Sequence, residues 1–207
     1  MKITAQENSV PKGRIVLRGY RAGAIKAVRP LAATLRQCQR DLRYAEERHR
    51  ERILHSITDL KRRIDVVLET YALGLETATH NLIMTGSLTG RDLLVQYLIG
   101  GTTYSGGINY GALGTGSTAP ASSDTQLTSE SARATPSTAL DVSNNEAEFQ
   151  FYFPDANLTN GTYHEAGTFM NGTATANSGK MFNHALLGTP YTKASGVDTT
   201  LQVNISM

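Results

Sequence analysis

The spacing of apolar residues divides the chain into two parts with different periodicities. From Leu31 to Leu73 there is neither Gly nor Pro, and apolar residues recur every three or four positions. This is the period of an amphipathic helix with a narrow apolar seam. The seam consists of Leu31, Leu35, Leu42, Ile53, Ile57, Leu60, Ile64, Val67 and Tyr71.

The seam lapses between Ala45 and Ile53, where charged residues replace the apolar ones. Two geometries fit this pattern. One is a single rod of about 43 residues, roughly 65 Å long at 1.5 Å per residue. The other is a pair of helices hinged at the charged stretch, which could fold back within one subunit. We favour the rod. Because a lone rod cannot cover its own seam, it predicts a coiled-coil homo-oligomer or a docking partner.

Beyond residue 80 the apolar runs are short, and Gly, Asn, Ser and Thr separate them. Residues 93–99 have helical spacing and end at a Gly pair, whereas 149–153 and 201–205 alternate as strands do. Residues 14–20 add a short strand ahead of the helix. The predicted fold class is therefore α+β. A long N-terminal amphipathic helical region (residues 1–80) precedes an antiparallel β-sandwich domain (residues 81–207).

The charge distribution follows the same division. Residues 1–80 hold 16 Lys and Arg against 9 Asp and Glu, about +7, and residues 81–207 hold 4 against 9, about −5. The arginines of the helical region alternate with Asp and Glu and have no aromatic residues among them to stack bases. A solvated or subunit-bridging face therefore fits better than a nucleic-acid interface. No apolar run approaches the ~18 residues that would span a membrane.

The sequence offers little catalytic chemistry. The Gly-rich residues 111–118 lack the Lys of a phosphate-binding loop and predict a structural turn. His164, Glu165, His184 and Asp155 match no metal-site spacing, and no Ser lies in a nucleophile-elbow sequence. The single cysteine, Cys38, fits a small buried residue of the helix. We therefore expect no enzyme, no cofactor and no metal.

The order of segments from Ile108 to Arg133 is distinctive. An apolar strand is followed by Ala-Leu-Gly-Thr-Gly, a Thr/Ala/Pro turn, Asp-Thr-Gln-Leu, and then Glu130 and Arg133. This block resembles structural proteins of tailed bacteriophages. The later Glu-Ala-Gly-Thr-Phe, which begins at Glu165, and the closing strand look like the matching parts of those proteins. One departure is Thr168, where the pattern favours Leu.

The resemblance implies a virion component of the tail, baseplate, fibre base or neck, synthesised in the host cytoplasm. Its expected partners are copies of itself and other virion proteins, with a host-surface receptor as a further partner. A receptor- or glycan-binding module of a tail fibre is one alternative, with Tyr104, Tyr110, Tyr163 and Tyr191 as stacking residues. A DNA-associated portal or neck component is the other.

The polar residues of the same block suggest a structural ion pair. Asp124 and Glu130 precede Arg133 in a stretch that has to cross the protein surface. A carboxylate paired with Arg fixes geometry well, so we expect such a pair to hold this long connection onto the β-domain.

Overall fold

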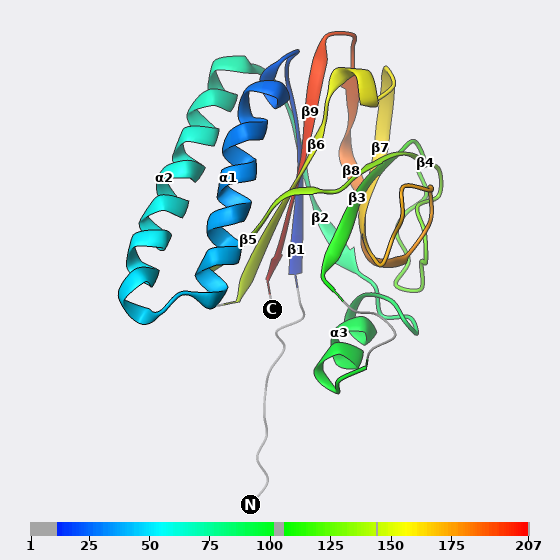
Figure 1. Ribbon diagram of the computed structural model, residues 1–207. Helices are drawn as coiled ribbons and strands as arrows, with labels where there is room; N and C mark the ends of the chain where they lie inside the picture. Colours follow the sequence, from blue (N-terminus) through cyan, green and yellow to red (C-terminus); the bar gives the residue numbers. More distant parts are fainter. Residues whose placement is uncertain (1–11, 102–105, 144, 207) are drawn as a thin grey trace, which may run out of the picture.

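The fold is built on one strongly curved antiparallel sheet. The computed structural model describes residues 12–101, 106–143 and 145–206. Their nine strands follow the order β4-β3-β7-β8-β2-β1-β9-β6-β5 (Figure 1). The elements are β1 (Lys12–Arg21), α1 (Ala24–Tyr44), α2 (Glu47–Tyr71), β2 (Ala72–Ile83), α3 (Gly90–Leu98), β3 (Ile108–Gly114), β4 (Glu130–Ala134), β5 (Pro136–Ser143), β6 (Glu146–Phe153), a 3₁₀ turn (Asp155–Asn157), β7 (Gly161–Met170), β8 (Lys180–Lys193) and β9 (Val197–Ser206).

The two ends of the sheet curl toward each other, so that β3 contacts β5 and β4 contacts β6. The result is a nearly closed barrel. Gly111 on β3 permits this approach, since a Cβ there would lie 2.6 Å from ring atoms of Phe151 on β6. The barrel interior is apolar and contains Ile15, Leu17, Leu113, Phe151, Phe153, Tyr163, Phe182, Leu201 and Val203, among others.

The helical region differs from the prediction. It is a hairpin inserted between β1 and β2, and it covers the outer face of the sheet (Figure 1). The chain reverses at Ala45 and Glu46, both of which have extended backbone angles. The predicted continuous rod and coiled coil are therefore wrong, and the hinged alternative describes the chain. Pro30 lies inside α1 at an exposed position, where it lacks the N–H that would donate a helical hydrogen bond.

The apolar seam of the helices is covered within the chain. Leu35, Leu60 and Ile64 are at most 7% exposed and pack with Tyr20, Leu140 and Tyr152 of the sheet. Leu31, Ile57, Val67 and Tyr71 are partly buried against the same cluster, as is Cys38. Leu42 and Ile53 lie half-buried near the turn. The seam therefore needs no neighbouring subunit to cover it.

The predicted fold class, a long N-terminal helical region followed by a β-sandwich, is thus wrong. The reason is the pairing of β1, which lies between β2 and β9 in the middle of the sheet. One continuous curved sheet then forms from strands on both sides of residue 80, and the helices pack on its outside. No helix of the described residues has the length and apolarity to cross a membrane.

Asp198 of β9 fixes the start of the hairpin. One of its carboxylate oxygens accepts hydrogen bonds from the backbone N–H groups of Gly23 and Ile25, at 3.1 and 2.9 Å. The other accepts from the N–H of Asp155, at 2.8 Å. The carboxylate therefore satisfies free N–H groups at the beginning of α1, where a negative charge is also favourable. It ties the first turn of the hairpin to the sheet.

We predict that Leu35→Ala lowers the free energy of unfolding by about 2–5 kcal/mol, as expected for a truncated core leucine. Leu54→Ala, at a site 47% exposed on the outer side of α2, is the control and should change it by less than about 0.5 kcal/mol. Urea titration at several protein concentrations measures both. A loss that varied with protein concentration would mean that the seam is covered between subunits instead.

Candidate functional site

The connection between β3 and β4, residues 115–129, is held against the barrel by the carboxylate of Glu165. This side chain on β7 is fully buried. Its Oε1 accepts hydrogen bonds from the N–H groups of Gly116 and Ser129, at 3.0 and 2.7 Å, and its Oε2 accepts one from Thr128 at 3.0 Å. Gly116 allows the approach, because a Cβ there would lie 2.4 Å from Oε1. One carboxylate therefore closes both ends of the connection.

His184 of β8 links Glu165 to the middle of the connection. Its Nε2 lies 3.0 Å from Glu165 Oε2, and its Nδ1 lies 2.8 Å from Asp124 Oδ2. Burial alone would lower the pKa of His184, but the hydrogen bonds to the two carboxylates outweigh burial and raise it. Burial likewise opposes ionisation of Glu165, yet the hydrogen bonds from His184, Ser129 and Thr128 leave its pKa lowered. The arrangement suits an imidazolium between two carboxylates.

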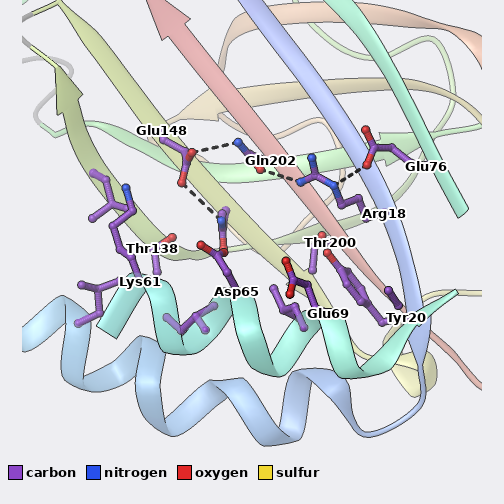
Figure 2. A pocket seen from close by; sticks show the side chains of 16 residues that line it. Arg18, Tyr20, Lys61, Asp65, Glu69, Glu76, Thr138, Glu148, Thr200 and Gln202 are labelled. Atoms are coloured by element: carbon purple, nitrogen blue, oxygen red, sulfur yellow. Dashed lines mark hydrogen bonds and ion pairs between the residues drawn. The ribbon is translucent and has the colours of Figure 1, made fainter. Parts of the chain in front are cut away.

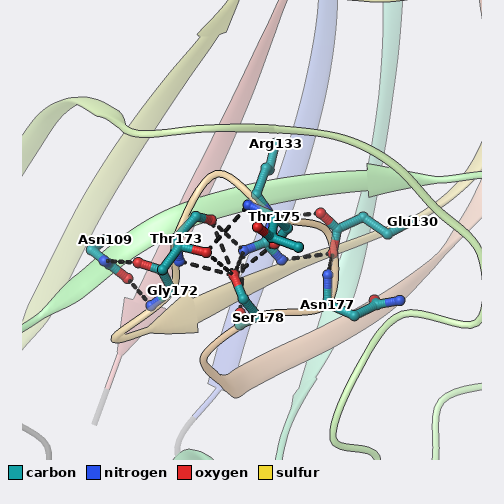
Figure 3. Close-up of polar contacts among 8 residues, drawn as sticks. All are labelled: Asn109, Glu130, Arg133, Gly172, Thr173, Thr175, Asn177 and Ser178. Carbon is teal, nitrogen blue, oxygen red and sulfur yellow. Dashed lines mark hydrogen bonds and ion pairs between the residues drawn. The ribbon is translucent and has the colours of Figure 1, made fainter.

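Arg133 and Glu130 form a second buried cluster, with the connection between β7 and β8 (Figure 3). The guanidinium of Arg133 donates to both oxygens of Glu130, at 2.5 and 2.7 Å, and the two side chains are 4% and 1% exposed. Its remaining donor group reaches the Thr173 carbonyl and Ser178. The guanidinium carbon also lies 5.2 Å from the ring centre of Tyr110 and 4.8 Å from that of Phe169. Charge and both ring faces hold Arg133 in place.

Of the three residues expected to form the ion pair, two pair with each other and the third lies elsewhere. Glu130 and Arg133 are together, whereas Asp124 bonds to His184 and to the N–H of Ala121. His184 and Glu165 meet, but Asp155 is elsewhere and pairs with the buried Lys193 at 2.5 Å. Across the described ranges no group of three or more His, Cys, Asp or Glu has a geometry that could hold a metal ion.

The tyrosines considered for sugar stacking are not free on the surface. Tyr163 and Tyr191 are 2% and 3% exposed, and Tyr110 is half-buried beside Arg133. Tyr104 lies outside the described residues. The three described rings therefore belong to the packing of the barrel and its connections.

A cavity of about 580 Å³ lies between the helical hairpin and the sheet (Figure 2). Its floor is a row of polar side chains across neighbouring strands. Arg18 donates to Glu76 at 2.7 Å and to Gln202 at 2.9 Å, and Gln202 donates in turn to Glu148 at 2.9 Å. Residues 18, 76, 148 and 202 come from β1, β2, β6 and β9. The floor is therefore a fixed, hydrogen-bonded surface.

The roof of the cavity comes mainly from α2. Figure 2 shows Lys61, Asp65 and Glu69 extending from the helix toward the sheet. Burial raises the pKa of Asp65; the charge of Lys61 opposes this rise and that of Glu69 adds to it. At the floor Thr138 is 1% exposed, and its hydroxyl has no hydrogen-bond partner among the described residues. The cavity thus combines unpaired carboxylates with an unsatisfied buried hydroxyl.

Sequence reasoning missed this cavity. Its residues come from seven separate elements, and only the folded sheet brings β1, β9 and β6 side by side. A partial indication was available in the final strand, where polar Thr200, Gln202 and Asn204 alternate with apolar residues. They indicate that the outer face of this strand is polar. They do not indicate that a helical hairpin covers it.

Comparisons with protein-family models, with curated proteins and with solved structures found no match to this chain.

We predict that Arg133→Ala lowers the free energy of unfolding by about 3–5 kcal/mol, because it leaves the Glu130 carboxylate buried and unpaired. The matched control is Arg62→Ala. Arg62 also pairs with an acid three residues earlier, Asp59, but its side chain is 74% exposed, so its loss should cost about 0–1 kcal/mol. Thermal and urea unfolding of both variants measure the difference. Equal losses would show that burial of the pair adds nothing to stability.

We predict that His184 makes stability depend on pH. Its pKa is raised in the folded protein, so its contribution is complete below the unfolded value of about 6.5 and is lost as pH rises through the folded value. The lowered pKa of Glu165 acts in the opposite sense, and its contribution is lost as pH falls below about 4.5.

The measurement is the free energy of unfolding of the native protein and of His184→Gln between about pH 5 and pH 9. The advantage of the native protein over the variant should be largest at the acid end and should shrink steadily above about pH 6.5. A difference that stayed constant or grew with pH would show that His184 is neutral in the folded protein.

Proposed function

We propose that this chain is a non-enzymatic structural component of a tailed-phage particle, in the tail, baseplate, fibre base or neck. The observation that supports this most is the arrangement of the residues that carry the resemblance. Asp124 and Glu165 are joined through His184, and Glu130 and Arg133 form the adjacent buried pair. The glycines at 114 and 116 leave room for the Glu165 carboxylate.

This arrangement argues against a chance match of composition. A stretch rich in Gly, Thr, Ser and Ala can look like many unrelated sequences. Here Glu165 and, through His184, Asp124 hold residues 115–129 against the barrel, and Leu127 of this connection is fully buried. The Glu130–Arg133 pair holds the neighbouring connection between β7 and β8. In this chain the pattern therefore corresponds to one structural device, in which a long connection is held onto a β-framework by buried charges.

Assembly with neighbouring subunits is supported by α3 rather than by the helical seam. Tyr97, Leu98 and Ile99 are 64%, 81% and 72% exposed, and Val95 is 51% exposed. These apolar residues are consecutive or nearly so, and they lie at the end of the molecule away from the hairpin (Figure 1). Grouped apolar side chains in water favour association. A neighbouring subunit in the particle, a second copy of this chain or another virion protein, would cover them.

We predict that mass spectrometry of purified tailed particles whose genome encodes this chain finds it at a fixed copy number per particle. A double substitution, Leu98→Lys with Ile99→Lys, should leave the melting temperature unchanged and abolish incorporation, because both side chains are exposed in the isolated fold.

The control is Leu54→Lys with Val66→Lys, which adds the same charge at two exposed apolar positions of α2 and should still be incorporated. Particles that lack the native chain would refute the proposed function. Incorporation of the α3 variant at the control's level would refute the role of α3.

A further inference from the structure

The cavity between α2 and the sheet contains groups that the fold itself leaves unused. The hydroxyl of Thr138 is buried without a partner among the described residues. Within the same ranges, the carboxylates of Asp65 and Glu69 make no hydrogen bond or ion pair, although they face the cavity one helical turn apart. A buried hydroxyl without a partner costs free energy, and a cavity of this polarity has room for a ligand that would satisfy it.

The net charge of the cavity lining determines whether a cation or an anion is favoured as ligand. Four carboxylates line the cavity, from Asp65, Glu69, Glu76 and Glu148, against the two cations of Arg18 and Lys61. Arg18 is already committed to Glu76 and Gln202. The lining therefore has surplus negative charge, concentrated where Asp65 and Glu69 form the exposed rim. Because the described carboxylates are not grouped as metal ligands are, an organic cation fits better than a metal ion.

The apolar part of the cavity lining indicates what the uncharged part of the ligand is. Leu35, Ile64, Leu68 and Leu140 line it, and each is at most 7% exposed. Contact between such apolar side chains and methylene groups is favourable, because both lose contact with water. Contact with a hydroxyl-rich surface is not, because it would leave hydroxyl groups without hydrogen-bond partners. The volume of about 580 Å³ lies in the range of small-molecule sites.

We propose that this cavity binds a short aliphatic diamine or linear polyamine. One ammonium group is held by the carboxylates of Asp65 and Glu69 at the rim. The methylene chain lies along the leucine and isoleucine side chains of the helices. A second ammonium group donates to Glu148 and to the hydroxyl of Thr138 at the floor, which is the acceptor that the folded chain leaves unpaired. This binding is separate from the proposed function and does not depend on it.

The test is isothermal titration of the full chain with 1,4-diaminobutane and with spermidine, at low and at moderate salt. We expect saturable binding at one site that weakens as salt rises. The neutral analogue 1,4-butanediol has the same length and should not bind measurably. Asp65→Asn with Glu69→Gln should weaken diamine binding by about tenfold or more, and Thr138→Val should weaken it by about threefold or more.

The matched control is Asp59→Asn with Glu51→Gln, which removes the same charge from α2 outside the cavity lining. This variant should bind as the native chain does. Equal weakening in control and cavity variants would reduce the effect to general charge and overturn the proposal. So would binding of the diol as tight as that of the diamine, or no saturation by about 10 mM diamine.

An NMR titration of the native chain keeps the test decisive even if a variant fails to fold. Amide shifts should move at Thr138, Leu140 and Gln202 and stay constant at Leu113 inside the barrel. Shifts confined to the outer side of the hairpin would overturn the proposal.

Discussion

The position of β1 between β2 and β9 constrains most of the remaining structure. β1 runs into the helices and β2 runs out of them, and the two strands are hydrogen-bonded, antiparallel neighbours. The intervening residues must therefore leave and return at the same end of adjacent strands. Two helices of 21 and 25 residues in antiparallel order satisfy this condition, whereas a single rod would carry the chain far from the start of β2. Asp198 on β9 then fixes where the first helix begins.

Two regions of the outer face of the curved sheet are covered by different physical means. On the side of β1, β9 and β6 the hairpin covers it with an apolar seam, in the ordinary manner of a helix on a sheet. On the side of β3, β7 and β8 an irregular connection covers it, and such a segment has few backbone partners of its own. A buried charge supplies them, because Glu165 accepts hydrogen bonds from three of its backbone N–H groups. Arg133 does the same for the neighbouring connection between β7 and β8, where it donates to the carbonyls of Thr173 and Ser178.

Local patterns predicted individual elements better than their assembly. The alternation at 149–153 and 201–205 and the helical spacing at 93–99 correspond to β6, β9 and α3. The apolar stripe of the helices was identified correctly. Periodicity does not reveal whether such a stripe is covered by the same chain or by another subunit. β2 was missed because its outer positions are largely exposed and its sequence, from Ala72 to Ile83, has no sustained apolar alternation. The sandwich prediction failed because strand count and turn spacing are the same for one curled sheet as for two packed ones.

The candidate sites show the same limit. Glu130 and Arg133 are three residues apart, so their pairing lies within reach of sequence reasoning, whereas Asp124 meets His184 sixty residues away. The cavity is further removed still, because it arises from a mismatch between two surfaces. The seam of the hairpin is apolar, but the strands beneath it present Arg18, Gln202 and Glu148 on the same face as Tyr20 and Leu140. Helices that packed closely over that row would remove its charged side chains from water, which costs free energy even for paired groups. The hairpin therefore stays clear of the row. The space that results has this polar row on the sheet side, and both apolar and acidic side chains of α2 on the helix side.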